Sequence, residues 1–296
     1  MRIATYHFQG RRAVGRLSDD GRTIAPLDLG PEAQRRGALA LVERAAAGGT
    51  PAPAGPPVPL AQISLEAPIP EPRRNIFCVG KNYHEHAHEF ARSGFDSSAA
   101  AGAVPEAPII FSKVPDCVTG PSTPILIDPE ASEAVDYEAE LAVVIGRGGR
   151  GIPRAKALDH VWAYTIVNDV TARDLQGRHK QWLIGKSQDS FCPMGPWLAT
   201  ADEVDLADTA VRCWVNGELR QDANTRDLIF DVPTLIEMLS RGLTLMPGDI
   251  IATGTPAGVG IGYNPPRYLK PGDIVRIEIG SIGVLENPVA RFREAA

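Results

Sequence analysis

The chain has 296 residues, of which 44% are apolar and 22% charged, a composition typical of a globular protein with a sizeable core. Its net charge is −6 and its basic residues do not cluster, which argues against a nucleic-acid-binding surface. No run approaches the roughly 20 apolar residues of a membrane helix, and the start "MRIATYHFQGRR" lacks an apolar signal-peptide region. We therefore expect a cytoplasmic protein that contacts neither nucleic acid nor membrane.

The spacing of the cysteines and the numbers of glycines and prolines indicate the general architecture of the chain. The four cysteines lie far apart among apolar neighbours and show no Cys-x-x-Cys spacing, which is typical of reduced thiols packed in a core. The chain contains 29 glycines and 26 prolines, which predicts many turns and many short strands. We expect β structure to dominate, with some α-helix.

Residues 1–70 are predicted to form a small N-terminal α/β domain. Short strands are expected around two turns, a Gln-Gly pair at position 9 and an Asp-Gly pair at position 20. One helix is expected over residues 31–49, where a Gly-Gly pair ends it. The proline-rich stretch "TPAPAGPPVPLAQ" then predicts a connector, so we place the domain boundary near residue 70 and a larger domain over residues 71–296.

The larger domain begins with "RNIFCVGKNYHEHAHEF", which predicts a buried strand, a glycine break and a short helix. Further along, Asn216-Gly217 is the strongest hairpin signal in the chain. The stretch "VPTLIEMLSRGLTLMPGD" predicts a helix that ends near Gly242. A Pro-Gly-Asp turn precedes a β run twice, at residues 247–254 and 271–280, but two copies do not make a repeat protein.

The stretch "VDYEAELAVVIG" at residues 135–146 predicts a strand with acidic side chains on one face. With a period of two, Asp136, Glu138 and Glu140 share a face that continues as apolar residues, so the strand enters a core. Two such glutamates can bind one hard divalent cation through oxygen. A solvated strand face is the alternative, and spacing alone does not decide whether Asp136 or Glu138 pairs with Glu140.

A third oxygen ligand is available in "TIVNDVTARD". Asp169 follows an apolar strand at the point where the chain turns, and acids at strand ends can reach a site built by neighbouring strands. The alternative is that Asp169 caps a helix starting near Thr171.

Four segments in the order "VDYEAELAVVIG", "NDVTARDLQ", "IGKSQDSFCPMGP" and "GDIIATGTPAGVG" resemble the signature segments of the fumarylacetoacetate hydrolase (FAH) family. The resemblance extends from about residue 72 to the C-terminus. It implies a mixed β-sandwich roll, usually a homodimer. It also implies Mg2+ or Mn2+ held by Glu138, Glu140 and Asp169, with Asp136 as a neighbour of the site.

The stretch "NYHEHAHE" has two interpretations. His84 and His88 formally match the His-Glu-x-x-His pattern of zinc proteases, but the longer metzincin form is absent because position 94 is glycine. The FAH resemblance instead implies that His86 and Glu89, three residues apart on a helical turn, act as a pair that activates water. A polar surface helix is a third interpretation, and we expect His84 and His88 at the surface.

Two glycine-containing stretches resemble nucleotide-binding motifs, but each lacks a feature that its motif requires. "GKS" at 185–187 resembles the end of a phosphate loop, but position 180 is lysine where that motif needs glycine. "GVGIG" at 258–262 leads into "YNPPRY" and not into a helix, so it is no dinucleotide fingerprint. The FAH resemblance implies a catalytic role for Lys186 beside the metal. For substrate binding it implies Arg173, Gln176, Thr255 and Lys113.

The resemblance implies a metal-dependent hydrolase that cleaves a carbon–carbon bond in an acylpyruvate-type 2-oxo acid, in the catabolism of aromatic compounds. Isomerisation or decarboxylation of a related 2-oxo or 2-hydroxymuconate-type acid is the alternative, since it uses the same enolate chemistry. A zinc protease and a non-catalytic metal-binding module are more distant alternatives. Residues 90–108, rich in small side chains, are expected to form a pocket wall that closes as a lid.

Overall fold

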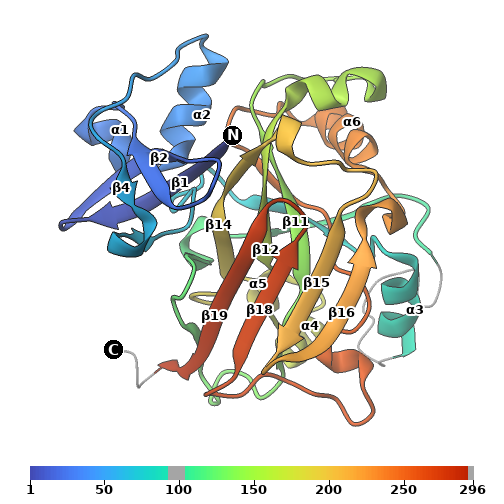
Figure 1. Cartoon of the computed structure of the whole chain (residues 1–296). Coiled ribbons are helices and arrows are strands. Elements are labelled where there is room, and N and C mark those ends of the chain that lie inside the picture. The colour runs from blue at the N-terminus through green and yellow to red at the C-terminus, as the bar shows by residue number, and fades with distance from the viewer. Residues whose placement is uncertain (93–103, 293–296) are drawn as a thin grey trace.

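The computed structural model describes residues 1–92 and 104–292 (Figure 1). The N-terminal unit begins with an antiparallel meander, whose turns fall at the predicted Gln-Gly and Asp-Gly pairs. Its strands are β1 (Arg2–Phe8), β2 (Arg11–Leu17), β3 (Thr23–Pro26), β4 (Val58–Pro59) and β5 (Ser64–Leu65).

The prediction of one helix over residues 31–49 is wrong. The segment forms α1 (Pro31–Arg35) and α2 (Ala38–Ala46), which are separated at Gly37. Gly37 has a φ of 61°, and a Cβ atom there would lie 2.6 to 2.9 Å from Pro70, the Thr5 hydroxyl and the Pro68 carbonyl. The chain must turn at this glycine because segments on both sides of it pack too closely for a side chain.

Hydrogen bonds join the N-terminal unit to the main body, because β1 pairs antiparallel with β14. The resulting large sheet has the order β4-β3-β2-β1-β14-β12-β11-β17-β6-β7. The domain boundary near residue 70 stays a prediction. The strands of the main body in this sheet are β6 (Ile76–Gly80), β7 (Ile109–Lys113), β11 (Ala139–Ile145), β12 (Val161–Asn168), β14 (Cys192–Thr200) and β17 (Ile250–Ala252).

A second sheet lies against the large one and is seen at the front of Figure 1. Its order is β16-β15-β18-β19-β9, and buried apolar side chains from both sheets form the main core. The hairpin at Asn216-Gly217 is confirmed, with φ angles of 52° and 78°. The strands are β9 (Ile125–Ile127), β15 (Ala210–Val215), β16 (Glu218–Asn224), β18 (Ile274–Ile279) and β19 (Gly283–Arg291).

The remaining elements are short, and the prediction of a mostly β protein with some helix is confirmed. The expected end of a helix near Gly242 is also confirmed. All four cysteines are free and buried. Within the described ranges, no helix is long and apolar enough to cross a membrane. These elements are β8 (Val118–Thr119), β10 (Val135–Asp136), β13 (Thr171–Ala172), α3 (His84–Arg92), α4 (Arg173–His179), α5 (Leu183–Lys186) and α6 (Val232–Gly242).

Candidate metal centre and active site

Three buried carboxylates meet where β11 and β12 run side by side. Ala139 of β11 pairs with Asn168 of β12. Glu138 and Glu140 lie on either side of Ala139 in the chain, and Asp169 directly follows Asn168, so the three acids come close together. The Asp169 backbone N–H donates to the Glu138 carbonyl at 2.9 Å. One carboxylate oxygen from each acid lies within 4.8 Å of the other two. A single ion can therefore bind all three.

The acidic stretch is not one continuous strand, because β10 ends at Asp136 and β11 begins at Ala139. Side chains bind the backbone N–H groups in the gap. The Glu138 N–H donates to Asn168 Oδ1 at 3.0 Å, and the Ala139 N–H donates to Gln221 Oε1 at 3.0 Å. This local break replaces strand pairing with side-chain hydrogen bonds that keep the buried backbone satisfied.

Asp136 does not belong to the ligand set. Its carboxylate accepts hydrogen bonds from the backbone of Gly260 at 2.7 Å and Ile261 at 3.0 Å, and from Arg173 Nε at 2.9 Å. The sequence left open which acid pairs with Glu140, and the geometry selects Glu138. Asp169 is also no helix cap, since α4 begins at Arg173 and has no side-chain cap.

Three buried cations contact these acids. Lys186 Nζ lies 2.7 Å from both Glu138 Oε2 and Asp169 Oδ2, and Arg173 Nη1 lies 2.7 Å from Glu138 Oε1. Lys113 Nζ lies 2.6 Å from Asp169 Oδ1 and also donates to the Val170 carbonyl. With Asp136, four carboxylates lie among these three cations, and in the described part of the chain Glu140 is the one that forms no ion pair. Buried charge of this kind is costly unless another cation joins it.

Glu140 is the acid that a bound cation would neutralise. Burial raises the pKa of Glu140 well above its ordinary value, and the negative Asp169 and Glu138 raise it further. For Glu138, burial also acts to raise the pKa, but Lys186 and Arg173 outweigh it and lower the pKa to about 2. Among the described residues, the hydrogen bond to the Glu140 carboxylate comes from the Gly254 backbone N–H at 2.8 Å. Three close oxygens with excess negative charge fit Mg2+ or Mn2+.

The pair of His86 and Glu89 lies on α3, where their side chains meet. His86 Nδ1 is 3.1 Å from Glu89 Oε2, and His86 is 5% exposed. His84 and His88 are exposed, as expected. Within residues 1–92 and 104–292, neither of them belongs to a group of ligand side chains that could hold an ion, so nothing supports the zinc interpretation.

The glycine-rich stretch at 258–262 packs its backbone against the carboxylate of Glu89. The Gly258 backbone N–H donates to Glu89 Oε1 at 3.0 Å, and Gly258 has a φ of 101°. A Cβ atom at Gly262 would overlap the Glu89 carboxylate. Glycine is required here because the backbone itself approaches and orients the acid.

A small cavity of about 20 Å3 lies beside Glu138, Glu140 and His86, so two acids of the candidate metal centre and the histidine face one space. Lys113 does not line this cavity and instead contacts Asp169 from behind. The sequence-predicted residues that line the cavity are His86, Glu138, Glu140, Arg173, Gln176, Lys186 and Thr255. Lining residues that sequence reasoning missed include Lys81, Phe111 and Trp182, whereas Phe90 belongs to the segment 90–108 predicted as a pocket wall.

Arg173 offers an unused donor to this cavity. Its Nη1 also lies 3.2 Å from Gln176 Oε1, whereas its Nη2 is buried without a hydrogen-bond partner in the described part of the chain. Buried donors are almost always satisfied, so an unsatisfied guanidinium nitrogen points to an anionic ligand.

Lys81 is a third cation at the cavity, beside Arg173 and Lys186, and the sequence analysis overlooked it. It follows β6 at a turn, has a φ of 53°, and is 3% exposed. Its Nζ lies 5.6 Å from the centre of the Phe90 ring. The available signal was a lysine directly after the buried "FCVG" strand. The predicted lid over 90–108 falls largely on residues 93–103, which lie outside the described residues.

A family model described as "Fumarylacetoacetate (FAA) hydrolase C-terminal" matches residues 75–290. The chain therefore belongs to the FAH family. This FAH-family chain is 49% identical to oxaloacetate tautomerase YisK of Bacillus subtilis over 231 residues, which cover 78% of this chain and 74% of that protein. It is 43% identical to human mitochondrial oxaloacetate tautomerase FAHD2A over 237 residues, 79% of this chain and 72% of that protein.

Solved structures of the FAH family also resemble this chain over nearly its full length. A fumarylacetoacetate hydrolase from Exiguobacterium antarcticum superposes with a TM-score of 0.84 and 39% identity, covering 98% of this chain and 99% of that one. A 2-hydroxyhepta-2,4-diene-1,7-dioate isomerase from Mycobacterium marinum gives 0.77 and 37%, covering 99% of each chain. The predicted FAH fold and the link to its isomerase-like branch are thus confirmed.

Proposed function

We propose that this FAH-family enzyme is a divalent-metal-dependent tautomerase of a 2-oxo dicarboxylic acid of the oxaloacetate type. The observation that carries the proposal is one cavity lined by Glu138 and Glu140 of the acid cluster, by Arg173 with its unsatisfied donor, and by the buried His86. The similarity to oxaloacetate tautomerases supports the choice of substrate. This choice replaces acylpyruvate cleavage, which we expected from the sequence, as the leading candidate.

Glu138, Glu140 and Asp169 are the residues that would hold Mg2+ or Mn2+. When bound, such an ion supplies a Lewis acid that favours the enolate form of a chelating 2-oxo acid. Arg173 then binds the substrate carboxylate through Nη2, and the Thr255 hydroxyl, which accepts from Gln221 Nε2 at 2.8 Å, donates beside it. Lys81 binds the second carboxylate, since it brings another buried cation to the same cavity.

The proton transfer is assigned to His86. Glu89 engages Nδ1 of the ring, which leaves Nε2 to take a proton from the carbon next to the keto group. Glu89 is itself fixed by the Gly258 N–H, so it holds the imidazole in a defined orientation. Lys186 Nζ, which lies between Glu138 and Asp169, donates to the oxygen that gains negative charge.

Acylpyruvate hydrolysis remains the second candidate, and the His86–Glu89 pair favours it. The same base could deprotonate a water molecule that attacks the distal carbonyl, with Lys186 and Gln176 as oxyanion donors. Such substrates arise in the breakdown of aromatic compounds. Tautomerisation needs no water in the cavity, whereas hydrolysis needs space for both water and substrate.

The experiment is a substrate panel assayed with Mg2+ and with Mn2+. We expect faster keto–enol exchange of oxaloacetate, followed by ultraviolet absorbance, and no release of pyruvate from acylpyruvates. His86→Ala should reduce this rate by about 100-fold or more while oxalate, an enolate mimic, still binds. Rapid pyruvate release from acylpyruvates with no effect on oxaloacetate would establish the hydrolase instead. Full activity in metal-free protein would refute both mechanisms.

Two further parts of the proposal concern the choice of ion and the assembly. We propose Mg2+ or Mn2+ without a preference, because all three ligands are carboxylate oxygens. We also keep the homodimer implied by the family resemblance. Sedimentation velocity tests it, with a single species of twice the chain mass of 31.7 kDa as the expected result.

A further inference from the structure

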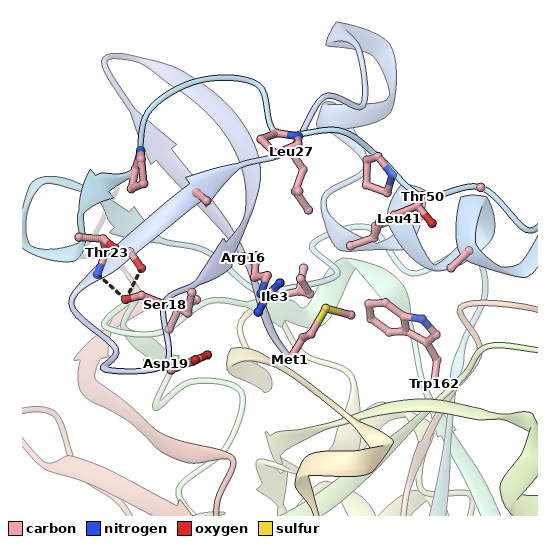
Figure 2. A pocket seen from close by; sticks show the side chains of 17 residues that line it. Met1, Ile3, Arg16, Ser18, Asp19, Thr23, Leu27, Leu41, Thr50 and Trp162 are labelled. Carbon is pink, nitrogen blue, oxygen red and sulfur yellow. Dashed lines mark hydrogen bonds between the residues drawn. The ribbon is translucent and has the colours of Figure 1, made fainter.

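We propose that a second, unassigned cavity binds a medium-chain monocarboxylate, with an apolar tail in the cavity and its carboxylate on Arg16 (Figure 2). This N-terminal cavity lies between the N-terminal unit and the start of β12. The lining residues used below are Ile3, Arg16, Leu27, Leu41, Ala45 and Trp162. The inference does not depend on the proposed function.

The size and the walls of the N-terminal cavity are those of a ligand site. Its volume is about 640 Å3, within the roughly 300 to 1,000 Å3 of typical small-molecule sites. Ile3 comes from β1, Leu27 follows β3, and Leu41 lies on α2, so separate elements supply the apolar wall. Figure 2 shows these side chains directed toward a common space.

Trp162 forms a fixed aromatic wall opposite them. It belongs to β12, in the main body, and a Cβ atom at Gly146 would lie only 2.6 Å from Trp162 Cβ and 3.2 Å from Cγ. Trp162 can therefore occupy this position only because residue 146 is a glycine and has no side chain. A half-buried indole offers a large rigid apolar surface to a ligand.

Arg16 gives the cavity its charge preference. It lies on β2 with an exposed side chain that forms neither an ion pair nor a hydrogen bond in the described part of the chain, whereas the half-buried Arg12 on the same strand pairs with Glu66. In Figure 2 its guanidinium is seen beside Ile3, the residue with which Arg16 pairs between β1 and β2, and Met1 lies between it and Trp162. A guanidinium beside apolar walls binds a carboxylate through two parallel hydrogen bonds. The carboxylate of an amphipathic ligand matches this position.

Asp19 restricts the ligand to a single negative group. It also lines the N-terminal cavity, and in Figure 2 it lies apart from Arg16, toward another edge. A second carboxylate on the ligand would meet this negative side chain and would be repelled. An alkyl monocarboxylate therefore suits the cavity, whereas the dicarboxylates proposed for the active site do not.

Decanoate is the probe, titrated by calorimetry into the full-length protein saturated with Mg2+ and oxalate, so that the catalytic centre is already filled. We expect saturable binding at one site per chain, with decan-1-ol bound about fivefold more weakly because it lacks the charge. Arg16→Gln should weaken decanoate binding about fivefold and leave decan-1-ol binding unchanged. Arg11→Gln is the matched control, an exposed arginine on the same strand that does not line the cavity, and should change neither.

Two further variants locate the binding. Ala45→Trp fills the cavity from α2 and should abolish binding of both probes. Trp162→Phe should retain binding but lose the change in tryptophan emission that decanoate causes in the wild-type protein. Absence of saturable binding to the wild-type protein would overturn the proposal. So would decanoate binding with equal affinity to the wild-type, Arg16→Gln and Ala45→Trp proteins.

Discussion

Glu140 and Glu138 are neighbouring buried acids with different surroundings. Glu138 contacts Lys186 and Arg173, whereas the hydrogen bond to Glu140 within the described ranges comes from the Gly254 backbone. Glu140 therefore carries the charge that the protein does not compensate by itself. This difference gives opposite predictions for two chemically identical substitutions.

Glu140→Gln should stabilise the metal-free protein, because it replaces a buried carboxyl group whose ionised form is disfavoured there and keeps an acceptor for Gly254. We expect the free energy of unfolding to rise by about 1 kcal/mol, and Mn2+ affinity to fall more than about tenfold. Glu138→Gln should also weaken Mn2+ binding. It should, however, destabilise the metal-free protein by about 3 kcal/mol, since Lys186 and Arg173 lose their partner.

Urea denaturation of metal-free protein and Mn2+ titration by calorimetry measure these effects. Two variants with equal losses of stability would contradict the assignment of the excess charge to Glu140. Unchanged Mn2+ affinity in either variant would remove that residue from the metal site.

Lys81 determines the expected selectivity for a second carboxylate. Lys81→Met keeps an apolar chain of similar length beside Phe90 and removes the charge. We expect kcat/KM for oxaloacetate to fall about tenfold, through KM, while kcat/KM for phenylpyruvate tautomerisation changes less than about twofold. Steady-state assays of both substrates provide the measurement. An equal loss for both would assign Lys81 to the chemistry common to all substrates and not to selectivity.

Single residues also show where sequence reasoning about the site ended. Periodicity placed Glu138 and Glu140 on one face with Asp136, the end of an apolar strand suggested Asp169, and the family resemblance then selected Glu138, Glu140 and Asp169. The choice between Asp136 and Glu138 depended on Arg173, Gly260 and Ile261, which lie far along the chain. Lys81 was missed because a lysine after a strand is usually solvated, and only the folded chain encloses it.

At the level of elements, α6 is capped by Asp231, whose side chain accepts from the Thr234 N–H at 2.9 Å. We expect Asp231→Ala to lower the free energy of unfolding by about 1 kcal/mol at pH 7, and Asp231→Asn, which keeps the acceptor, to cost less. Burial acts to raise the pKa of Asp231, but hydrogen bonds from Thr234 and the nearby Arg154 lower it. Its contribution is therefore present above its unfolded pKa and is lost as the pH falls through the folded value.

Urea denaturation at pH 7 and pH 3 checks the Asp231 prediction. The difference between wild-type and Asp231→Ala protein should shrink at the lower pH, because the carboxylate is then partly protonated in both states. A difference that grows on acidification would contradict the role of the ionised cap.

The elements that sequence reasoning predicted are those whose signals are local. The Asn216-Gly217 hairpin and the end of α6 follow from neighbouring residues. The break at Gly37 follows from Pro70 and Thr5, and the gap between β10 and β11 depends on Asn168 and Gln221. No local pattern predicts these interruptions, because their causes are contacts made only in the folded chain.

At the scale of the whole molecule, the candidate metal centre lies at the large sheet, whose strands extend to the N-terminal unit. Asp169 follows β12, and β12 pairs with β14, which in turn pairs with β1. An ion bound by residues of β11 and the end of β12 would therefore raise the free energy of unfolding of the whole sheet, because it binds only the folded form. Metal content should thus govern the stability of the protein as well as its activity.

Removal of the ion should lower the melting temperature. A ligand that binds the folded state alone stabilises it by about 2.7 kcal/mol when its free concentration is 100 times its Kd. We expect calorimetric scans to show a higher Tm as Mn2+ is added to chelator-treated protein, with a dependence on the logarithm of its concentration. Glu138→Gln should show little of this increase, which provides the matched control for weak binding elsewhere. A wild-type Tm that does not respond to Mn2+, or an equal response in Glu138→Gln, would contradict a metal site formed by the three acids.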